Sequence, residues 1–147
     1  MWRLLQAWVL RLVGAVEVLA FGAVVMPRAW MDASHAGMGL AEMPRGPVFD
    51  SVMRQVSFTY GLHGVALWFI AADVVRYRPL VILSAFGYLL TFPVFVLIDR
   101  AVGMPWYWAA GNGGSCLLVG AVLLGLLWAE RACGEGATDA AGTPEGR

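Results

Sequence analysis

The stretch that most constrains this chain is 56–75, whose sequence is VSFTYGLHGVALWFIAADVV. It holds about twenty mostly apolar residues, and a helix of that length, rising ~1.5 Å per residue, crosses the ~30 Å hydrocarbon core of a bilayer. His63 lies near its start and Asp73 near its end. Because an ionisable side chain in lipid is costly, each of these two needs a partner on a neighbouring helix. The rest of the chain is therefore expected to fold around them.

The composition favours a bilayer over water as the surrounding solvent. Of the 147 residues, 60% are hydrophobic and 14% are charged, whereas about 25% of residues are charged in a soluble domain. The formal net charge is zero, and no basic stripe or nucleic-acid motif occurs, so we expect no nucleic-acid partner. The cysteines, Cys116 and Cys133, form no CxxC or Cys/His spacing, and no metal site is expected.

Four apolar runs predict four transmembrane helices. Proline ends the first at Pro27, because it cannot continue the helical hydrogen-bond ladder, and Pro105 suits the first turn of the fourth. Pro93 is expected to kink the third. The predicted fold class is all-α, a polytopic four-transmembrane-helix bundle over residues 1–131, with helices at about 4–25, 56–75, 80–98 and 105–129.

The segments outside these helices predict the topology. The connection 27–55 is long and rich in Met and Trp, which favours a position on the membrane surface, and residues 32–37 are expected to form a short helix within it. Residues 132–147 are small and polar and are predicted to be disordered. The arginines near the termini lie in short segments, where the positive-inside rule applies. We therefore expect a multi-pass protein of the inner (plasma) membrane with both termini in the cytoplasm.

Counting residues along each predicted helix brings one polar group from every helix to a common depth. That depth is about 10–13 Å below the surface that carries the long connection. The sharpest candidates are Glu17 and His63, because a carboxyl and an imidazole at one depth can share a proton or bind a ligand. Asn112 is equally suited to an interhelical hydrogen bond, and Thr91 to a bond within its own helix. The candidate polar pocket comprises Glu17, His63, Asn112, Thr91 and, about one turn nearer the surface, Tyr60.

A second pair of polar residues is expected deeper, in the half of the membrane nearer the termini. Arg11 and Asp73 reach similar depths there and are predicted to form a structural ion pair, because a paired charge is tolerated in lipid where a single one is not. The alternative is that Asp73 reaches the interface beside Arg76.

The sequence predicts no reaction. It has no nucleophile–His–acid motif, no P-loop and no glycine-rich nucleotide fingerprint. A bis-His haem between helices is not expected either, because one of the two histidines, His35, lies in the long connection. No cofactor is predicted. A quinone is the alternative that the Glu17–His63 pair allows.

Several short motifs between residues 10 and 115 carry a resemblance to a known family. They are Glu17, Trp30-Met31-Asp32 with His35, Tyr60-Gly61 with Gly64, Arg76-Tyr77-Arg78-Pro79, Asp99, and Gly103-Met104-Pro105 with Trp108. With these motifs the chain resembles small bacterial four-helix membrane proteins of the DoxX-like kind, or an uncharacterised family near them. The resemblance implies the four-helix membrane architecture, and it implies a quinol or redox partner for some members.

Together these observations predict an accessory or structural membrane subunit, or a binder of a small lipophilic molecule, without catalysis of its own. The alternatives are a quinone-linked redox component and a proton-coupled small transporter, both using Glu17 and His63. The expected partners are the lipid bilayer and either another membrane protein or further copies of the chain.

Overall fold

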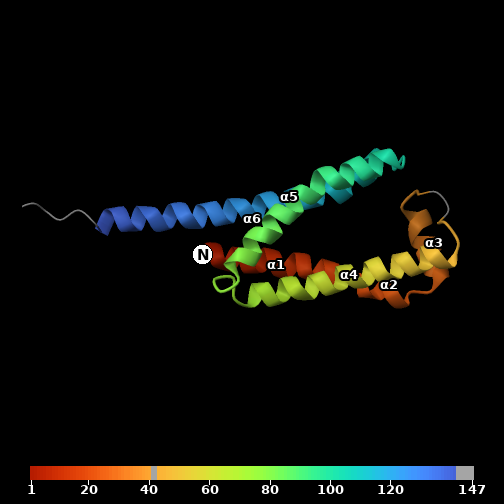
Figure 1. Ribbon diagram of the computed structural model, residues 1–147, viewed down its shortest axis with the longest axis horizontal. Coiled ribbons are helices and arrows are strands. Elements are labelled where there is room, and N and C mark those ends of the chain that lie inside the picture. Colours follow the sequence, from red (N-terminus) through yellow and green to blue (C-terminus); the bar gives the residue numbers. More distant parts are fainter. Residues whose placement is uncertain (41–42, 142–147) are drawn as a thin grey trace, which may run out of the picture. The chain divides into compact units, whose positions relative to one another are not determined.

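The computed structural model describes residues 1–40 and 43–141, with side chains to residue 133, and this part of the chain is all-helical (Figure 1). The predicted all-α class is therefore confirmed. The chain forms two compact units, Leu10–Phe69 in one and Met1–Val9 with the residues from Ile70 onward in the other, and each is described by itself. The helices are α1 (Trp2–Val18), α2 (Phe21–Val25), α3 (Arg28–Gly37), α4 (Pro47–Ala72), α5 (Arg78–Ala101) and α6 (Trp106–Ala141).

Three helical stretches in the described residues are long and apolar enough to cross a membrane: Trp2–Val25, Arg78–Ala101 and Trp106–Cys133. The prediction of four such helices is thus confirmed for three. The exception is α4, which contains residues 56–72 of the 56–75 run and ends before its last three residues. The 26 residues of α4 are long enough, but polar residues such as Gln55, Tyr60 and His63 lower its mean hydropathy.

In the unit Leu10–Phe69, the first predicted helix is divided into α1 and α2 by a turn at residues 19–20. There the amide of Leu19 donates to Val16 and that of Ala20 to Glu17, each three residues back rather than four. Such 3₁₀-type bonds tighten the backbone locally. Glu17 therefore lies at the last turn of α1, immediately before the interruption.

Arg54 on α4 holds the end of α2. Its guanidinium donates to the carbonyl oxygen of Val24 and, at 3.2 Å, to that of Met26. The last carbonyl groups of a helix have no partner within the helix. Arg54 supplies that partner from α4, and Pro27 then separates α2 from α3 with an extended backbone.

Arg28 holds the long connection together. Its guanidinium pairs with Asp32 at 3.0 Å and with Asp50 on α4, and it donates to the carbonyl oxygens of Met43 at 3.1 Å and Pro44 at 2.8 Å. One cation thus joins α3, the segment before α4 and the first turn of α4. The short helix expected at 32–37 is present and begins earlier, at Arg28.

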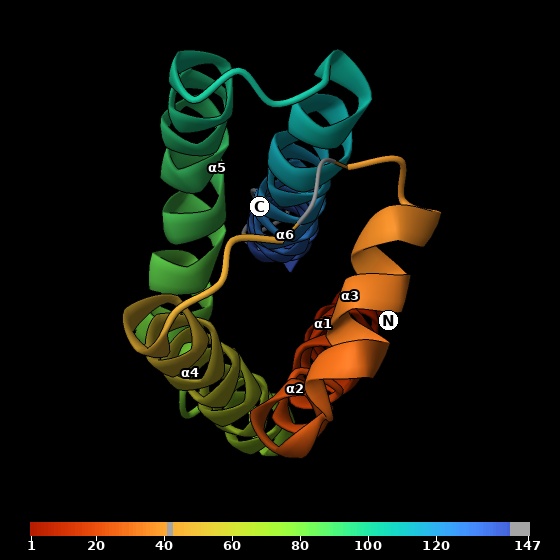
Figure 2. The same cartoon turned by 90° about the vertical axis from the view of Figure 1, so that its right-hand side faces the viewer.

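In the other unit, α5 and α6 lie side by side as an antiparallel hairpin (Figure 2). The two helices approach closely at Gly113 and Gly120 on α6. A Cβ added at Gly120 would lie 2.9 Å from the carbonyl oxygen of Ala85, and one at Gly113 would lie 2.8 Å from Val96 Cγ2. The turn between the helices contains Gly103 with φ of 77°, a conformation that favours glycine.

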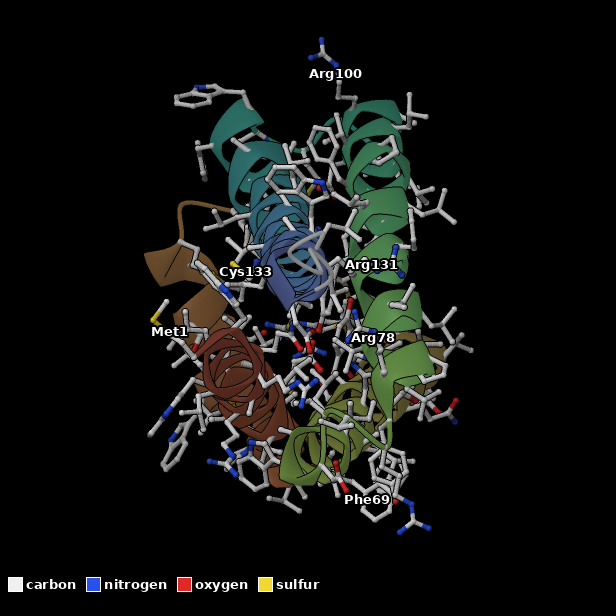
Figure 3. The ribbon with its side chains drawn as sticks, turned by 90° about the vertical axis from the view of Figure 1, so that its left-hand side faces the viewer. Met1, Phe69, Arg78, Arg100, Arg131 and Cys133 are labelled. Atoms are coloured by element: carbon white, nitrogen blue, oxygen red, sulfur yellow. The ribbon has the colours of Figure 1, made fainter. Side chains whose placement is uncertain are left out.

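The outer faces of these helices are apolar, and side chains project from them along their length (Figure 3). On α5, Leu83, Leu90 and Leu97 recur at a seven-residue spacing, which keeps them on one face of a helix. Their exposed fractions are 66%, 69% and 68%. A stripe of exposed leucine is unfavourable in water and neutral in lipid.

The last helix is longer than the sequence predicts. It was expected to end near Ala129 and to be followed by a disordered tail from residue 132, but the backbone of α6 stays helical through Ala141. Four of residues 132–141 are alanine, the residue with the highest helix propensity, and extending an existing helix is easier than nucleating one. The rest of that predicted tail, 142–147, lies outside the described residues.

Candidate functional site

The candidate site is built on a direct backbone contact between α1 and α4. A Cβ added at Gly14 would lie 2.7 Å from the carbonyl oxygen of Gly64, and one added at Gly64 would lie 2.6 Å from that of Gly14. No side chain fits at either position without a shift of the backbones. Small residues at such a crossing let two helices approach closely, and here they bring the neighbouring side chains within hydrogen-bonding distance.

Glu17 and His63 meet beside this crossing. The distance between His63 Nδ1 and Glu17 Oε2 is 2.6 Å. The side chain of Glu17 is 13% exposed, whereas that of His63 is 48% exposed. The carboxyl group is thus covered by the two helices and the imidazole reaches the outer surface of this unit. The two residues are thus in contact, and their common depth in a membrane stays a prediction.

Further contacts join α1 and α2 to α4 on both sides of the crossing. On one side, the indole Nε1–H of Trp68 donates to the backbone carbonyl oxygen of Arg11 at 2.9 Å. On the other, the ring of Phe21 lies against Gly61, where an added Cβ would be 2.6 Å from the ring. The centroid of the same ring is 5.6 Å from that of Phe58. The Glu17–His63 pair therefore lies in the middle of a continuous antiparallel contact.

This arrangement has a definite chemistry. With its proton on Nδ1, His63 donates to the carboxylate of Glu17, which fixes the orientation of the ring and leaves Nε2 as an acceptor. An imidazole held in this way can hydrogen-bond a hydroxyl or carbonyl group of a ligand, or accept a proton and pass it to the carboxylate. Within the described side chains, no group of His, Cys, Asp and Glu is arranged to hold a metal ion.

The other predicted pocket residues do not all belong to this unit. Tyr60 does, and it lies on α4 three residues before His63 and is 41% exposed. Thr91 and Asn112 belong to the α5/α6 unit. Thr91 donates to the carbonyl oxygen of Gly87 at 2.8 Å, within its own helix. That Thr91 and Asn112 share one pocket with Glu17 and His63 stays a prediction.

Asn112 forms the interhelical hydrogen bond that its position allows. Its Nδ2 donates to Asp99 Oδ2 at 3.3 Å, from α6 to the last turns of α5. Asp99 is 7% exposed, although the sequence places it in a turn. A buried carboxylate needs such a partner, so this bond stabilises the hairpin.

The predicted pair of Arg11 and Asp73 stays a prediction, because the two residues fall in different units. The carboxylate of Asp73 accepts a hydrogen bond from the backbone amide of Arg76 at 3.0 Å. This contact is in line with the alternative in which Asp73 lies in the turn beside Arg76. Asp73 follows α4 directly and is exposed.

A polar cluster that residue spacing does not predict surrounds Glu130. This carboxylate accepts from Arg3 Nε at 2.6 Å, from Gln6 Nε2 at 3.2 Å and from Arg78 at 2.9 Å. Its side chain is 12% exposed, and Gln6 is 2% exposed. The available signal was Gln6 itself, a large polar residue within an otherwise apolar helix. The cluster ties the first turns of α1 and α5 to the end of the apolar part of α6.

No protein-family model, curated protein or solved structure matches this chain. A functional proposal therefore depends on the residues and their contacts.

Proposed function

We propose that this chain is a small multi-pass membrane protein that binds a small lipophilic molecule, with the Glu17–His63 pair as the polar anchor of the site. In this proposal it acts as an accessory or binding subunit without catalysis of its own. The chain crosses the inner membrane four times, with both termini in the cytoplasm. The DoxX-like resemblance is part of the same proposal.

Three apolar helices and one less apolar helix support the four-pass arrangement. The three have mean hydropathies of 2.0, 2.3 and 1.8. The fourth, α4, has 26 residues, so it is about 39 Å long and longer than the ~30 Å hydrocarbon core. Its polar His63 is paired with Glu17, which lowers the cost of placing it in lipid.

The observation that carries the binding proposal is the contact between Glu17 and His63 at 2.6 Å, with one partner covered and the other half exposed. A pair serving only to join α1 to α4 has no need to expose its imidazole. Apolar pockets with one or two fixed polar groups are typical of small-molecule sites, because the polar groups orient the ligand. Aromatic residues on the same helices, Phe58 and Trp68, offer apolar surface near it.

Bound molecules can be identified directly. The protein purified in a mild detergent is extracted with organic solvent, and the extract is analysed by mass spectrometry. We expect a lipophilic compound, with a hydroxyl or carbonyl group and in near-equal molar amount, in the wild type. Glu17→Gln and His63→Ala are expected to lose most of it. His35→Gln, which removes the other histidine, is the matched control and is expected to keep it.

Yield and melting temperature are recorded for each variant, so that a loss of ligand can be separated from a loss of fold. The binding proposal is wrong if well-folded Glu17→Gln and His63→Ala proteins retain the same compounds as the wild type. It is also wrong if the wild-type extract contains only bulk membrane lipids.

A second function, proton transfer to a quinone or a transported solute, is favoured by the same short Glu17–His63 distance, because a hydrogen bond of this length allows proton sharing. In liposomes that contain a pH-sensitive dye, a proton-coupled transporter acidifies the lumen when its solute is added. A quinone as the extracted compound, or dye acidification that Glu17→Gln abolishes, would favour this function over simple binding.

The four-pass topology has its own test. Reporter fusions or membrane-impermeant cysteine labels at residues 1 and 147 are expected on the cytoplasmic side, and a label in the α3–α4 connection on the opposite side. Termini on opposite faces of the membrane would show an odd number of crossings and would contradict the four-pass arrangement.

A further inference from the structure

We propose that the open end of the α5/α6 hairpin is a binding site for one anionic phospholipid, whose phosphate binds Arg100 and whose acyl chain lies in the cavity between the helices. This inference depends on membrane insertion of α5 and α6, which is part of the proposed function, but not on the Glu17–His63 site. It concerns a different unit of the chain and a different ligand.

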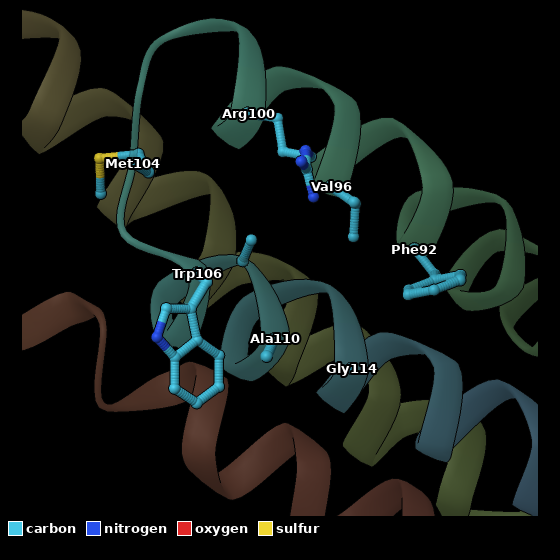
Figure 4. A pocket seen from close by; sticks show the side chains of 8 residues that line it. Phe92, Val96, Arg100, Met104, Trp106, Ala110 and Gly114 are labelled. Atoms are coloured by element: carbon cyan, nitrogen blue, oxygen red, sulfur yellow. The ribbon is translucent and has the colours of Figure 1, made fainter.

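The site is a cavity of about 600 Å³ near the turn that joins the two helices. This volume lies within the ~300–1,000 Å³ typical of small-molecule sites. Figure 4 shows Phe92, Val96 and Arg100 on the α5 side, facing Trp106, Ala110 and Gly114 on α6. Arg100 is the charged residue among those that line the cavity, and the remaining lining is apolar or small.

The cavity exists because α6 presents small residues where α5 presents larger ones. At Gly113 the helices are in contact, since an added Cβ would lie 2.8 Å from Val96 Cγ2. One position further, a Cβ at Gly114 would meet nothing within 4 Å. The hairpin therefore opens on the face that bears Ala110 and Gly114. Apolar walls of this kind suit a hydrocarbon chain.

The charge at the cavity mouth selects an anion. Arg100 lies in the last turn of α5, where a transmembrane helix reaches the headgroup region. Its neighbour Asp99 is the nearest opposite charge in sequence, but that carboxylate is 7% exposed and accepts a hydrogen bond from Asn112. Arginine binds phosphate through paired N–H donors. A zwitterionic headgroup offers the same phosphate together with a cation, so the match is best for a headgroup of net negative charge.

Trp106 marks the same depth. It is 80% exposed, and its ring packs edge-on against Tyr107 with centroids 6.2 Å apart. Exposed Trp and Tyr side chains are enriched at the membrane–water interface. The order along the cavity is thus cation and aromatic ring at the mouth, then apolar wall, which is the order of headgroup and acyl chain in a lipid.

The test uses full-length protein that has been purified in detergent and depleted of lipid. Phosphatidylglycerol, phosphatidylcholine or inorganic phosphate is added back, and the melting temperature and the number of bound lipids, by native mass spectrometry, are measured. We expect one tightly bound phosphatidylglycerol and a rise in melting temperature that phosphatidylcholine and phosphate do not reproduce. Arg100→Gln is expected to weaken phosphatidylglycerol binding about tenfold, as for loss of one charge-assisted contact.

Two variants with the same substitution separate the cavity from the fold. Gly114 lines the cavity, and a Cβ there meets nothing within 4 Å, so Gly114→Leu is expected to occupy the cavity and abolish binding of the tight lipid. Gly111→Leu is the matched control on the same helix, because a Cβ there also meets nothing within 4 Å and Gly111 does not line the cavity. It is expected to bind as the wild type does.

Equal binding of phosphatidylglycerol and phosphatidylcholine would overturn the proposal and indicate an ordinary lipid shell. Undiminished binding in folded Arg100→Gln or Gly114→Leu protein would overturn it as well. An effect of inorganic phosphate equal to that of the lipid would show that the acyl chain has no part. None of these results bears on Glu17 and His63, whose ligand is tested separately.

Discussion

Glu130 accepts a hydrogen bond from Arg78 across the α5/α6 hairpin, at 2.9 Å between Oε2 and the guanidinium nitrogen. Arg3 and Gln6 donate to the same carboxylate. The three donors leave Glu130 12% exposed, although it lies at the boundary of an apolar helix. The cluster therefore joins the starts of α1 and α5 to α6 through polar contacts.

Removing the charge of Glu130 is expected to destabilise the protein. Glu130→Gln should lower the free energy of unfolding by about 1–3 kcal/mol, because charged hydrogen bonds are lost while Arg78 stays partly covered. The double variant with Arg78→Gln should lose less than the sum of the two single variants. Denaturant unfolding in detergent measures all three. Strict additivity would show that the pair contributes nothing.

A methyl group at the α1–α4 crossing should be poorly tolerated. Gly64→Ala places a Cβ 2.6 Å from the carbonyl oxygen of Gly14, and overpacking of this kind costs about 1–3 kcal/mol. The helices must then separate, so Gly64→Ala is also expected to weaken ligand retention by the Glu17–His63 pair. Gly87→Ala is the control, since a Cβ there meets nothing within 4 Å. Equal melting temperatures for the two variants would contradict the close approach.

Trp68→Phe tests the hydrogen bond next to that crossing. The substitution keeps an aromatic ring but removes the donor to the carbonyl oxygen of Arg11. A loss of about 1 kcal/mol is expected, the usual net contribution of a neutral hydrogen bond. Trp128→Phe serves as the comparison, because Trp128 is 74% exposed and should tolerate the change. Thermal unfolding followed by circular dichroism measures both.

Arg28 should protect the connection between α3 and α4 from proteolysis. In Arg28→Met, the contacts to Asp50 and to the carbonyl groups of Met43 and Pro44 are lost. Trypsin is then expected to cut after Arg45 several-fold faster than in the wild type, because cleavage requires local opening. Arg131→Met controls for the change in charge. Unchanged cleavage at Arg45 would show that other contacts hold the segment.

The apolar runs predict most of the helical framework, because length and hydropathy are local properties that a sequence states directly. The run 80–98 lies within α5, and the run 105–129 lies within α6 except for Pro105, which immediately precedes that helix. The division of the first helix at residues 19–20 and the extension of α6 to Ala141 were not predicted. No strong sequence feature predicts either of them. At residues 19–20, for example, no Pro or polar cluster marks the division of the helix. The mean hydropathy of α4 is lower than that of the other three helical stretches because α4 carries the polar residues that make it a candidate site.

The candidate site was predictable in depth but not in rotation. Counting residues brings Glu17 and His63 to one level, yet only the contact of Gly14 with Gly64 turns them toward each other. The sequence predicts Asn112 near this pair, and its side chain donates to Asp99, a residue that the sequence assigns to a turn. Side-chain direction depends on tertiary packing that residue spacing alone does not encode.

The leucine stripe of α5 has a consequence for how the chain is made. Leu83, Leu90 and Leu97 are each about two-thirds exposed, and a ribosome that releases such a surface into water exposes it to every other nascent chain. For the membrane protein proposed above, synthesis is expected to be coupled to delivery at a bilayer, and overproduction beyond the capacity of the insertion machinery should yield aggregates. The same stripe makes the choice of detergent, rather than of buffer, the decisive variable in purifying this protein.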